Sequence, residues 1–301
     1  MVLAWPLMLA ERGSTSVRAK ATSPPPRSNG GAYGVRVVGI EVPAGQLVDA
    51  PTHWPAVEVR LRTAPAPAPA AEYVTERVAR LNVRSGGVLL MDRLPARATF
   101  TLPAAPSGSA LVHPHLAAVG AVWAHWLGHE PFHAGAFVAG AGVWGVLGDK
   151  GAGKSSMLAA LAHRGVPIVC DDVLVLDRNR ALAGPRSIDL RADAARTLGI
   201  GAPLGVVGER ERWRVPLEPI EPTLPFCGWI TLDWSERPTL RPLQGAERLR
   251  ALLQHRALRI VPGGPSALLD LAGHPFLEFC RPRRWSEIEK ASELLLEALS
   301  G

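Results

Sequence analysis

Eight residues near the middle of the chain, Gly148-Asp149-Lys150-Gly151-Ala152-Gly153-Lys154-Ser155, fit the pattern G-x-x-x-x-G-K-[ST]. The glycines of such a loop let successive backbone N–H groups turn inward around phosphate oxygens, and the following helix adds the positive end of its dipole. Lys154 would reach the β- and γ-phosphates, and Ser155 offers a hydroxyl to Mg²⁺. The pattern therefore predicts a site for ATP and Mg²⁺ made by residues 148–155 together with Ser156.

Two adjacent carboxylates follow this loop at short range. Asp171 and Asp172 stand in "CDDV", 17 and 18 residues after Lys154, at the end of an apolar strand. One of them can hold Mg²⁺ while the other accepts a proton from an attacking hydroxyl. A solvated strand end without chemistry is the alternative for this pair.

A histidine precedes the loop by one expected β-hairpin. His133 lies in "PFHAGAF", and the next strand, Val143–Leu147, enters the loop beside it. From spacing alone a lone histidine near an apolar strand is more often structural, but nearby phosphoryl chemistry favours a catalytic role.

The elements that must position these residues can be recognised from their patterns. Strands are expected over Phe132–Val138 and Val143–Leu147, joined by the tight turn "AGAG", and a helix is expected from the loop to about His163. "VPIVCDDVLVLD" predicts an apolar strand interrupted by the two aspartates. Later elements are listed here: a buried helix over His115–Leu127, strands over Trp213–Leu217 and Trp229–Leu232, and a C-terminal helix whose capping box would be Ser286 and Glu289.

The part of the chain before the helix at residue 115 is expected to be rich in strands. "VRVVGIEV", "VEVRLR", "GGVLLMD" and "ARATFTL" all have strand character, and "PAAPSGSA" is a plausible boundary. The expected organisation is a disordered leader (1–33), a small β-rich domain (34–105) and a phosphate-loop domain (110–301). The fold class expected is α/β, with a mixed sheet flanked by helices.

Composition narrows the function classes. The 301 residues carry a net charge of +6, and half of this excess lies in residues 1–30, while arginine alternates with acidic residues elsewhere. This distribution argues against nucleic-acid binding.

The start "MVLAWPLMLA" imitates the apolar core of a signal peptide. No positive charge precedes it, however, and Glu11 and Arg12 follow at once, which argues against a signal peptide. No stretch of the sequence approaches the length of a membrane span. Cys170, Cys227 and Cys280 lie far apart in the sequence, which favours free thiols in a reducing cytoplasm. The composition does not decide between a monomer and a homo-oligomer.

The order of these motifs resembles the HPr kinase/phosphorylase family and its HPr-kinase-like relatives, which share a core with phosphoenolpyruvate carboxykinases. The stretch that carries the resemblance is "FHAGAFVAGAGVWGVLGDKGAGKSSMLAALAHRGVPIVCDDVLVLD", residues 132–177. The resemblance implies that Asp171 is the base for a seryl or similar hydroxyl, that Asp172 assists the metal, and that His133 positions the acidic pair.

The chain departs from that family after the acidic strand. The bifunctional enzymes carry a Glu-x-Arg-Gly-x-Gly signature, whereas this region reads "GPRSIDLRADAARTLG", with Arg186, Asp189 and Arg191 as polar candidates. The departure argues against HPr as the substrate and against phosphorolysis. The pattern looks closer to HPr-kinase-like proteins encoded beside peptide-tailoring enzymes, some of which phosphorylate a serine on a peptide.

Three functions are therefore compared. The first is an ATP- and Mg²⁺-dependent kinase for a hydroxyl, a serine above all, of a peptide, protein or small molecule. The second is a nucleotide-binding regulator or ATPase switch that transfers no phosphate, and the third is a degenerate structural relative. The acidic pair favours the kinase, and the intact Lys154-Ser155 pair argues against the third.

Overall fold

The computed structural model describes residues 30–65, 68–83, 86–207 and 210–300. Residues 1–29 of the leader expected over residues 1–33 lie outside the described residues. Its last residues depart from that expectation, because Gly30–Ala32 form a strand and Tyr33 is 1% exposed. A chain of apolar and glycine residues at 30–33 packs into the core, so the ordered structure begins before residue 34.

An eight-stranded mixed sheet forms the N-terminal part of the molecule, with strand order β3-β1-β2-β4-β8-β7-β6-β5. The strands are β1 (Gly30–Ala32), β2 (Val35–Val38), β3 (Val48–Asp49), β4 (Ala56–Thr63), β5 (Tyr73–Val74), β6 (Val78–Asn82), β7 (Val88–Asp92) and β8 (Arg97–Leu102). Alternating burial along β8 places Ala98, Phe100 and Leu102 in a core shared with helix α2 (Leu116–Trp126).

A nine-stranded mixed sheet carries the predicted nucleotide loop. Its strands are β9 (Glu130–Phe132), β10 (Gly135–Ala139), β11 (Gly142–Leu147), β12 (Ile168–Cys170), β13 (Leu174–Asp177), β14 (Arg180–Leu182), β18 (Thr223–Trp234), β19 (Thr239–Pro242) and β20 (Phe276–Arg281). Strands β11, β18 and β20 are parallel neighbours. Their carboxyl ends therefore meet at one edge, which is where open α/β sheets bind ligands.

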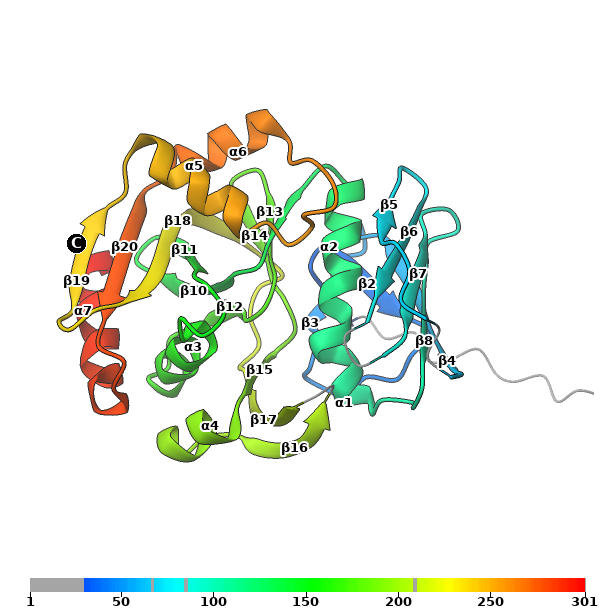
Figure 1. Cartoon of the computed structure of the whole chain (residues 1–301), viewed down its shortest axis with the longest axis horizontal. Helices are drawn as coiled ribbons and strands as arrows, with labels where there is room; N and C mark the ends of the chain where they lie inside the picture. The colour runs from blue at the N-terminus through cyan, green and yellow to red at the C-terminus, as the bar shows by residue number, and fades with distance from the viewer. Residues whose placement is uncertain (1–29, 66–67, 84–85, 208–209, 301) are drawn as a thin grey trace, which may run out of the picture.

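Helices cover both faces of this second sheet (Figure 1). The remaining elements are α1 (Gly108–Ala110), a kinked turn (Leu111–His115), α3 (Lys154–His163), β15 (Ser187–Leu190), α4 (Ala192–Leu198), β16 (Ala202–Val207), β17 (Arg210–Pro216), α5 (Gly245–Gln254), α6 (Pro265–Ala272), a 3₁₀ turn (Trp285–Glu287) and α7 (Ile288–Ser300). Helices α3 and α7 share one hydrophobic core with the nine-stranded sheet. Helices α5 and α6 contribute to a second hydrophobic core of the same sheet. Helix α2 lies between the two sheets.

The expected class, α/β with mixed sheets flanked by helices, is confirmed. Three local expectations differ, and the first is "VRVVGIEV", where strand β2 ends already at Val38. The strand expected over Phe132–Val138 is divided at His133, because β9 pairs with β13 whereas β10 pairs with β11 and β12. The capping box expected at Ser286 is wrong, since Ser286 lies inside the 3₁₀ turn and α7 begins only at Ile288.

The first prediction concerns where the chain can be shortened. A chain starting at Gly30 should keep the melting temperature of the full protein, whereas one starting at Gly34 loses β1 and the buried Tyr33. Loss of a large buried aromatic residue destabilises by about 3–5 kcal/mol. Calorimetric melting of both shortened chains should show a fall of several degrees for the second only; equal melting temperatures would contradict this assignment.

The second prediction concerns pH and His115, which is buried and lies 5.6 Å, ring centre to ring centre, from Phe100. Burial, followed by the charge of His113, lowers the pKa of His115 to about 4. The unfolded chain, with a histidine pKa near 6.5, therefore binds the proton more readily. The contribution of neutral His115 to the free energy of unfolding is therefore fully present above pH 6.5. It is lost as the pH falls toward 4, and the loss is roughly 2 kcal/mol at pH 5.

Urea unfolding between pH 7 and pH 5 measures this effect. The loss of unfolding free energy should be smaller in His115→Gln than in the wild type, because the variant has no imidazole to protonate. Parallel pH profiles for the two proteins would show that His115 does not carry the dependence.

Candidate functional site

The predicted phosphate loop has glycines in the left-handed region of backbone conformation. Gly151 and Gly153 have φ angles of +96° and +81°, which are strained for residues with a side chain. Strand β11 ends at Leu147 and α3 begins at Lys154, so the loop occupies the connection between strand and helix. Gly153 is the residue that caps the start of α3. The first amides of the helix therefore lie at the loop, where they can act as donors to an anion.

Lys154 folds back over the loop. Its Nζ donates a hydrogen bond to the carbonyl oxygen of Gly148 at 2.5 Å. Burial lowers the pKa of Lys154, while the negative charges of Asp171, Asp172 and Asp149 act in the opposite direction. The ammonium group thus lies against the loop and within the electrostatic influence of the acidic pair.

The other loop residues differ in exposure. Asp149 and Lys150 are exposed, Ala152 is buried, and Ser155 and Ser156 are partly buried in the first turn of α3. The Asp149 Oδ1 atom accepts a hydrogen bond of 2.9 Å from Nε2 of Gln254, the last residue of α5. The loop is therefore tied to α5 as well as to its own strand and helix.

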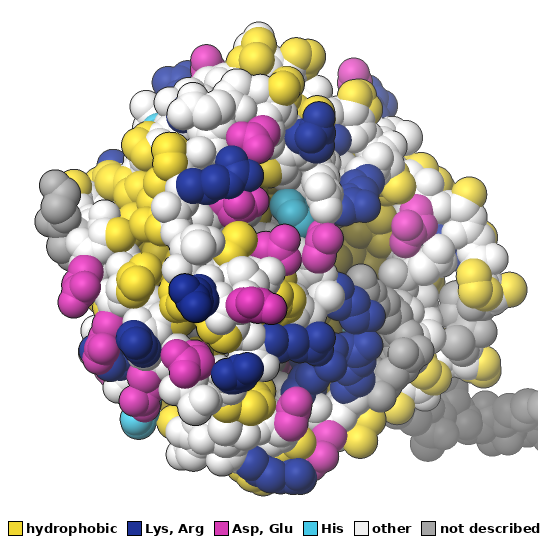
Figure 2. Space-filling model, turned by 60° about the vertical axis from the view of Figure 1, so that its left-hand side comes forward, with side chains coloured by type: hydrophobic (Ala, Val, Ile, Leu, Met, Phe, Trp, Pro, Cys, Tyr) yellow, Lys and Arg dark blue, Asp and Glu magenta, His cyan; other side chains and the backbone are white. Residues whose placement is uncertain are grey.

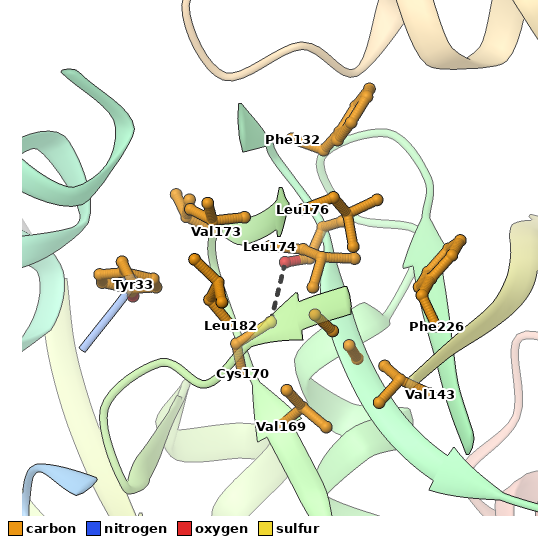
Figure 3. Packing of buried hydrophobic residues seen from close by; sticks show 14 of the residues in the cluster. Tyr33, Phe132, Val143, Val169, Cys170, Val173, Leu174, Leu176, Leu182 and Phe226 are labelled. Atoms are coloured by element: carbon orange, nitrogen blue, oxygen red, sulfur yellow. Dashed lines mark hydrogen bonds between the residues drawn. The ribbon is translucent and has the colours of Figure 1, made fainter. Parts of the chain in front are cut away.

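The acidic pair lies in the short connection between β12 and β13. Cys170, the last residue of β12, is fully buried and its thiol faces the carbonyl oxygen of Ala134 at 3.9 Å (Figure 3). The buried Cys170 therefore fixes the backbone immediately before Asp171 and Asp172. Asp171 is only 6% exposed, whereas the side chain of Asp172 is about one-third exposed.

The two carboxylates have opposite pKa shifts. Burial raises the pKa of Asp171 to about 6, although the charge of His113 and the Ser155 side chain act against this. Burial also disfavours the charged form of Asp172, but a hydrogen bond from His133 and the charges of His113, His133 and Lys154 lower its pKa to about 2. Divergent pKa values in neighbouring groups are typical of an acid–base site.

The Ser155 side chain acts to lower the pKa of Asp171, so the predicted phosphate loop and the acidic pair are close enough to interact. The site therefore joins residues from the two motifs that the sequence places 16 positions apart.

His133 lies against Asp172. Its Nδ1 is 3.3 Å from Asp172 Oδ1 and 3.0 Å from the Asp172 carbonyl oxygen. The backbone N–H of His133 donates to the carbonyl oxygen of His255 at 2.7 Å, so the end of α5 fixes the break between β9 and β10. His255 has no signal in the local sequence that connects it with this site.

Further residues near the pair come from distant parts of the chain. His113 and Asp189 are buried, with His113 Nε2 at 4.0 Å from Asp189 Oδ2, and Arg214 binds both Asp189 oxygens at 2.7 and 2.8 Å. Tyr33 is fully buried; burial raises its pKa, as do the nearby charges of Cys170 and the acidic pair. The N-terminal segment thus reaches the candidate site.

The polar candidates that follow the acidic strand have different roles. Arg186 is buried and donates to the carbonyl oxygens of Ile168 at 2.8 Å and of Glu218 at 2.6 Å, so it braces β12. Asp189 forms the ion pair with Arg214, and Arg191 is exposed before α4. Of the three, only Asp189 lies in the network that includes His113.

Three further observations concern the surface charge, the metal-ligating side chains and the length of the helices. On the face in Figure 2, charges of both signs are interspersed, and one group of basic side chains lies beside a recess. Among the described residues, no group of three or more His, Cys, Asp or Glu side chains is placed to hold a metal ion. Within the same residues, no helix is long and apolar enough to cross a membrane.

No family model and no curated protein matches the chain. Among solved structures, the chain is similar to the Hpr(Ser) kinase/phosphatase from Coxiella burnetii, with 16% identity and a TM-score of 0.30. The match covers 57% of this chain and 99% of that one. A match with this identity and TM-score does not carry an activity from one protein to the other, so the function is inferred from the residues of this chain.

Proposed function

We propose that the protein is a kinase that uses ATP and Mg²⁺ to phosphorylate a hydroxyl group, with a serine of a peptide as the favoured acceptor. The position of Asp171 beside the predicted phosphate loop carries this proposal, because this buried carboxylate, whose pKa is about 6, interacts with both Lys154 and Ser155 of the loop. A general base is most effective when its pKa lies near the working pH.

The loop residues 148–155 bind the nucleotide phosphates in this proposal. Backbone N–H groups of the loop and the start of α3 donate to phosphate oxygens, and Lys154 exchanges its contact with the Gly148 carbonyl for one with the γ-phosphate. The Lys154 ammonium group already lies near the carboxylates of Asp171, Asp172 and Asp149, so the side chain has to move little to reach the phosphates.

The donor set fits Mg²⁺. A serine hydroxyl and a carboxylate are hard oxygen ligands, and Mg²⁺ is commonly bound by one or two such protein groups together with substrate phosphates and water. Ser155 and Asp172 would hold the ion, because the low pKa of Asp172 keeps its carboxylate ionised. When bound, the metal neutralises charge on the phosphates.

Asp171 accepts the proton in the transfer step. The acceptor oxygen forms a bond to the γ-phosphorus, the bond from that phosphorus to the bridging oxygen of ADP breaks, and the hydroxyl proton moves to the Asp171 carboxylate. His133 holds Asp172 in place through its Nδ1 atom, 3.3 Å from Oδ1. The two aspartates thereby keep separate tasks, one toward the proton and one toward the metal.

The proposal is tested by incubating the full chain with labelled ATP, Mg²⁺ and a library of serine, threonine and tyrosine peptides. Mass spectrometry should detect a peptide heavier by one phosphoryl group, absent with Lys154→Ala. Nucleotide binding without transfer to any peptide, protein or small-molecule hydroxyl, and with nucleotide-dependent capture of a partner protein, would instead support the regulatory switch.

A further inference from the structure

Arg281, the last residue of β20, is a buried cation beside the phosphate loop. It is 3% exposed, and no carboxylate among the described residues lies within ion-pair distance of its guanidinium. Its Nη2 donates to the carbonyl oxygens of Ala152 at 2.9 Å and of Gly153 at 3.4 Å, whereas Nη1 has no hydrogen-bond partner there. A buried charge compensated by loop carbonyls and an aromatic ring, with no carboxylate partner, is unfavourable by itself and calls for a function.

Trp234, at the end of β18, acts on the same loop. Its Nε1 donates to the carbonyl oxygen of Gly151 at 3.3 Å, and its ring centre lies 4.3 Å from the Arg281 guanidinium carbon. Trp234 and Arg281 are paired in the parallel register of β18 and β20. Two neighbouring strand ends thus present a stacked pair of donors to the loop.

These contacts hold three consecutive loop carbonyls on one side. In a trans peptide the C=O of one residue and the N–H of the next point in opposite directions. Carbonyls of 151, 152 and 153 that face the pair therefore direct the N–H groups of 152, 153 and 154 away from it. The Ala152 N–H donates to the Asp149 carbonyl oxygen at 3.0 Å. Of these three N–H groups, those of Gly153 and Lys154 are then left for an anion, beside the Ser155 and Ser156 amides in the first turn of α3.

Gly153 is shaped for this arrangement. A Cβ atom there would lie 2.7 Å from Arg281 Nη2 and 3.1 Å from the Trp234 ring. The missing side chain is thus what lets the pair approach the loop, in addition to the positive φ of Gly153. The close approach and the donor geometry both point to a loop that is held in shape from outside.

We propose that Arg281 and Trp234 are positioning residues that hold the loop with the Gly153 and Lys154 amides directed at the nucleotide phosphates before nucleotide binds. This inference rests on the proposed function of the loop. Neither side chain contacts the nucleotide in this arrangement, and both act through the loop carbonyls.

The first test measures binding of inorganic tripolyphosphate with Mg²⁺ by calorimetry. Arg281→Met keeps the apolar stem and removes the donors, and loss of hydrogen bonds from a charged group typically weakens binding by about 10- to 100-fold. Trp234→Phe keeps a ring but removes the N–H, so a weaker effect of roughly 2- to 5-fold is expected. Arg283→Met is the matched control, because Arg283 is exposed and 5.9 Å from the Trp234 ring centre.

The second test needs no nucleotide. Lysine occurs only at 20, 150, 154 and 290, so a protease specific for lysine reports on the loop through cleavage after Lys150 and Lys154. In Arg281→Met, these two cleavages should become about tenfold faster, because local opening is easier when the loop has lost its donors. Cleavage after Lys290, in α7, serves as the internal control for global unfolding.

Each outcome decides a separate point. Weaker binding together with faster loop cleavage supports the proposal, and partial recovery in Arg281→Lys strengthens it. Unchanged cleavage with weaker binding would overturn it, because Arg281 would then act on the ligand directly; faster cleavage with unchanged binding would also overturn it. If Arg281→Met accelerates cleavage after Lys290 by the same factor, the variant unfolds globally. The same comparison of loop cleavage and tripolyphosphate binding in Trp234→Phe then decides. If the wild type binds no tripolyphosphate, the proposed function fails while the cleavage comparison still tests the pair.

Discussion

Lys154→Ala is expected to reduce phosphoryl transfer by about 10²–10³-fold and to weaken ATP binding. The ammonium group lies between the loop and the acidic pair, where it would stabilise the charge that develops on the transferred phosphoryl group. Removal of one such preorganised donor typically costs about 3–4 kcal/mol in the transition state. Turnover with a peptide acceptor and calorimetric titration with ATP measure the two effects.

The matched control is Lys290→Ala, which removes an exposed lysine of α7 on the same chain. This variant should keep wild-type affinity and turnover, and both variants should keep the melting temperature, because the only hydrogen bond of the Lys154 ammonium group in the described structure is to one loop carbonyl. Wild-type ATP affinity in Lys154→Ala would mean that the loop is not the nucleotide site.

The second large effect is expected from the acidic pair, and it separates the kinase from the switch. Asp171→Asn should leave Mg²⁺-ATP bound but lower the transfer rate by about 10²–10⁴-fold, because the hydroxyl proton has lost its acceptor. Asp172→Asn should instead weaken nucleotide affinity and the dependence on Mg²⁺ together, because a metal ligand has lost its charge. Single-turnover rates and titrations at several Mg²⁺ concentrations distinguish the two variants.

The contradicting outcomes for the pair are specific. Asp171→Asn with a wild-type transfer rate would remove Asp171 as the base. An exchange of the two phenotypes would keep the kinase but reverse the tasks within the pair, since the Ser155 side chain also acts on Asp171. Effects of both variants on nucleotide affinity alone would favour a switch, in which no acceptor hydroxyl is deprotonated.

The local part of the site could be predicted from the sequence because its signals are short. The glycine pattern fixes a loop between β11 and α3, and the apolar run before Cys170 predicts a strand that ends at the acidic pair. Spacing of this kind follows from backbone geometry, which needs no knowledge of the tertiary fold.

The remaining contacts depend on strand order and could not be predicted. Arg281 reaches the loop 129 residues from Ala152 only because β20 and β11 both flank β18. His113 and Tyr33 approach the acidic pair from segments before the loop, and no local pattern distinguishes them from core residues. Ser286 shows the opposite error, because a good capping pattern lies inside a 3₁₀ turn.

The most direct measurement is a calorimetric titration of the full chain with ATP, with Mg²⁺ and then with Mg²⁺ removed by a chelator. The proposed site predicts one ATP per chain, tighter binding with Mg²⁺ than without it, and a marked loss of affinity in Lys154→Ala. Absence of binding at millimolar ATP, or equal binding by Lys154→Ala, would contradict a nucleotide site at residues 148–155 and, with it, the proposed kinase.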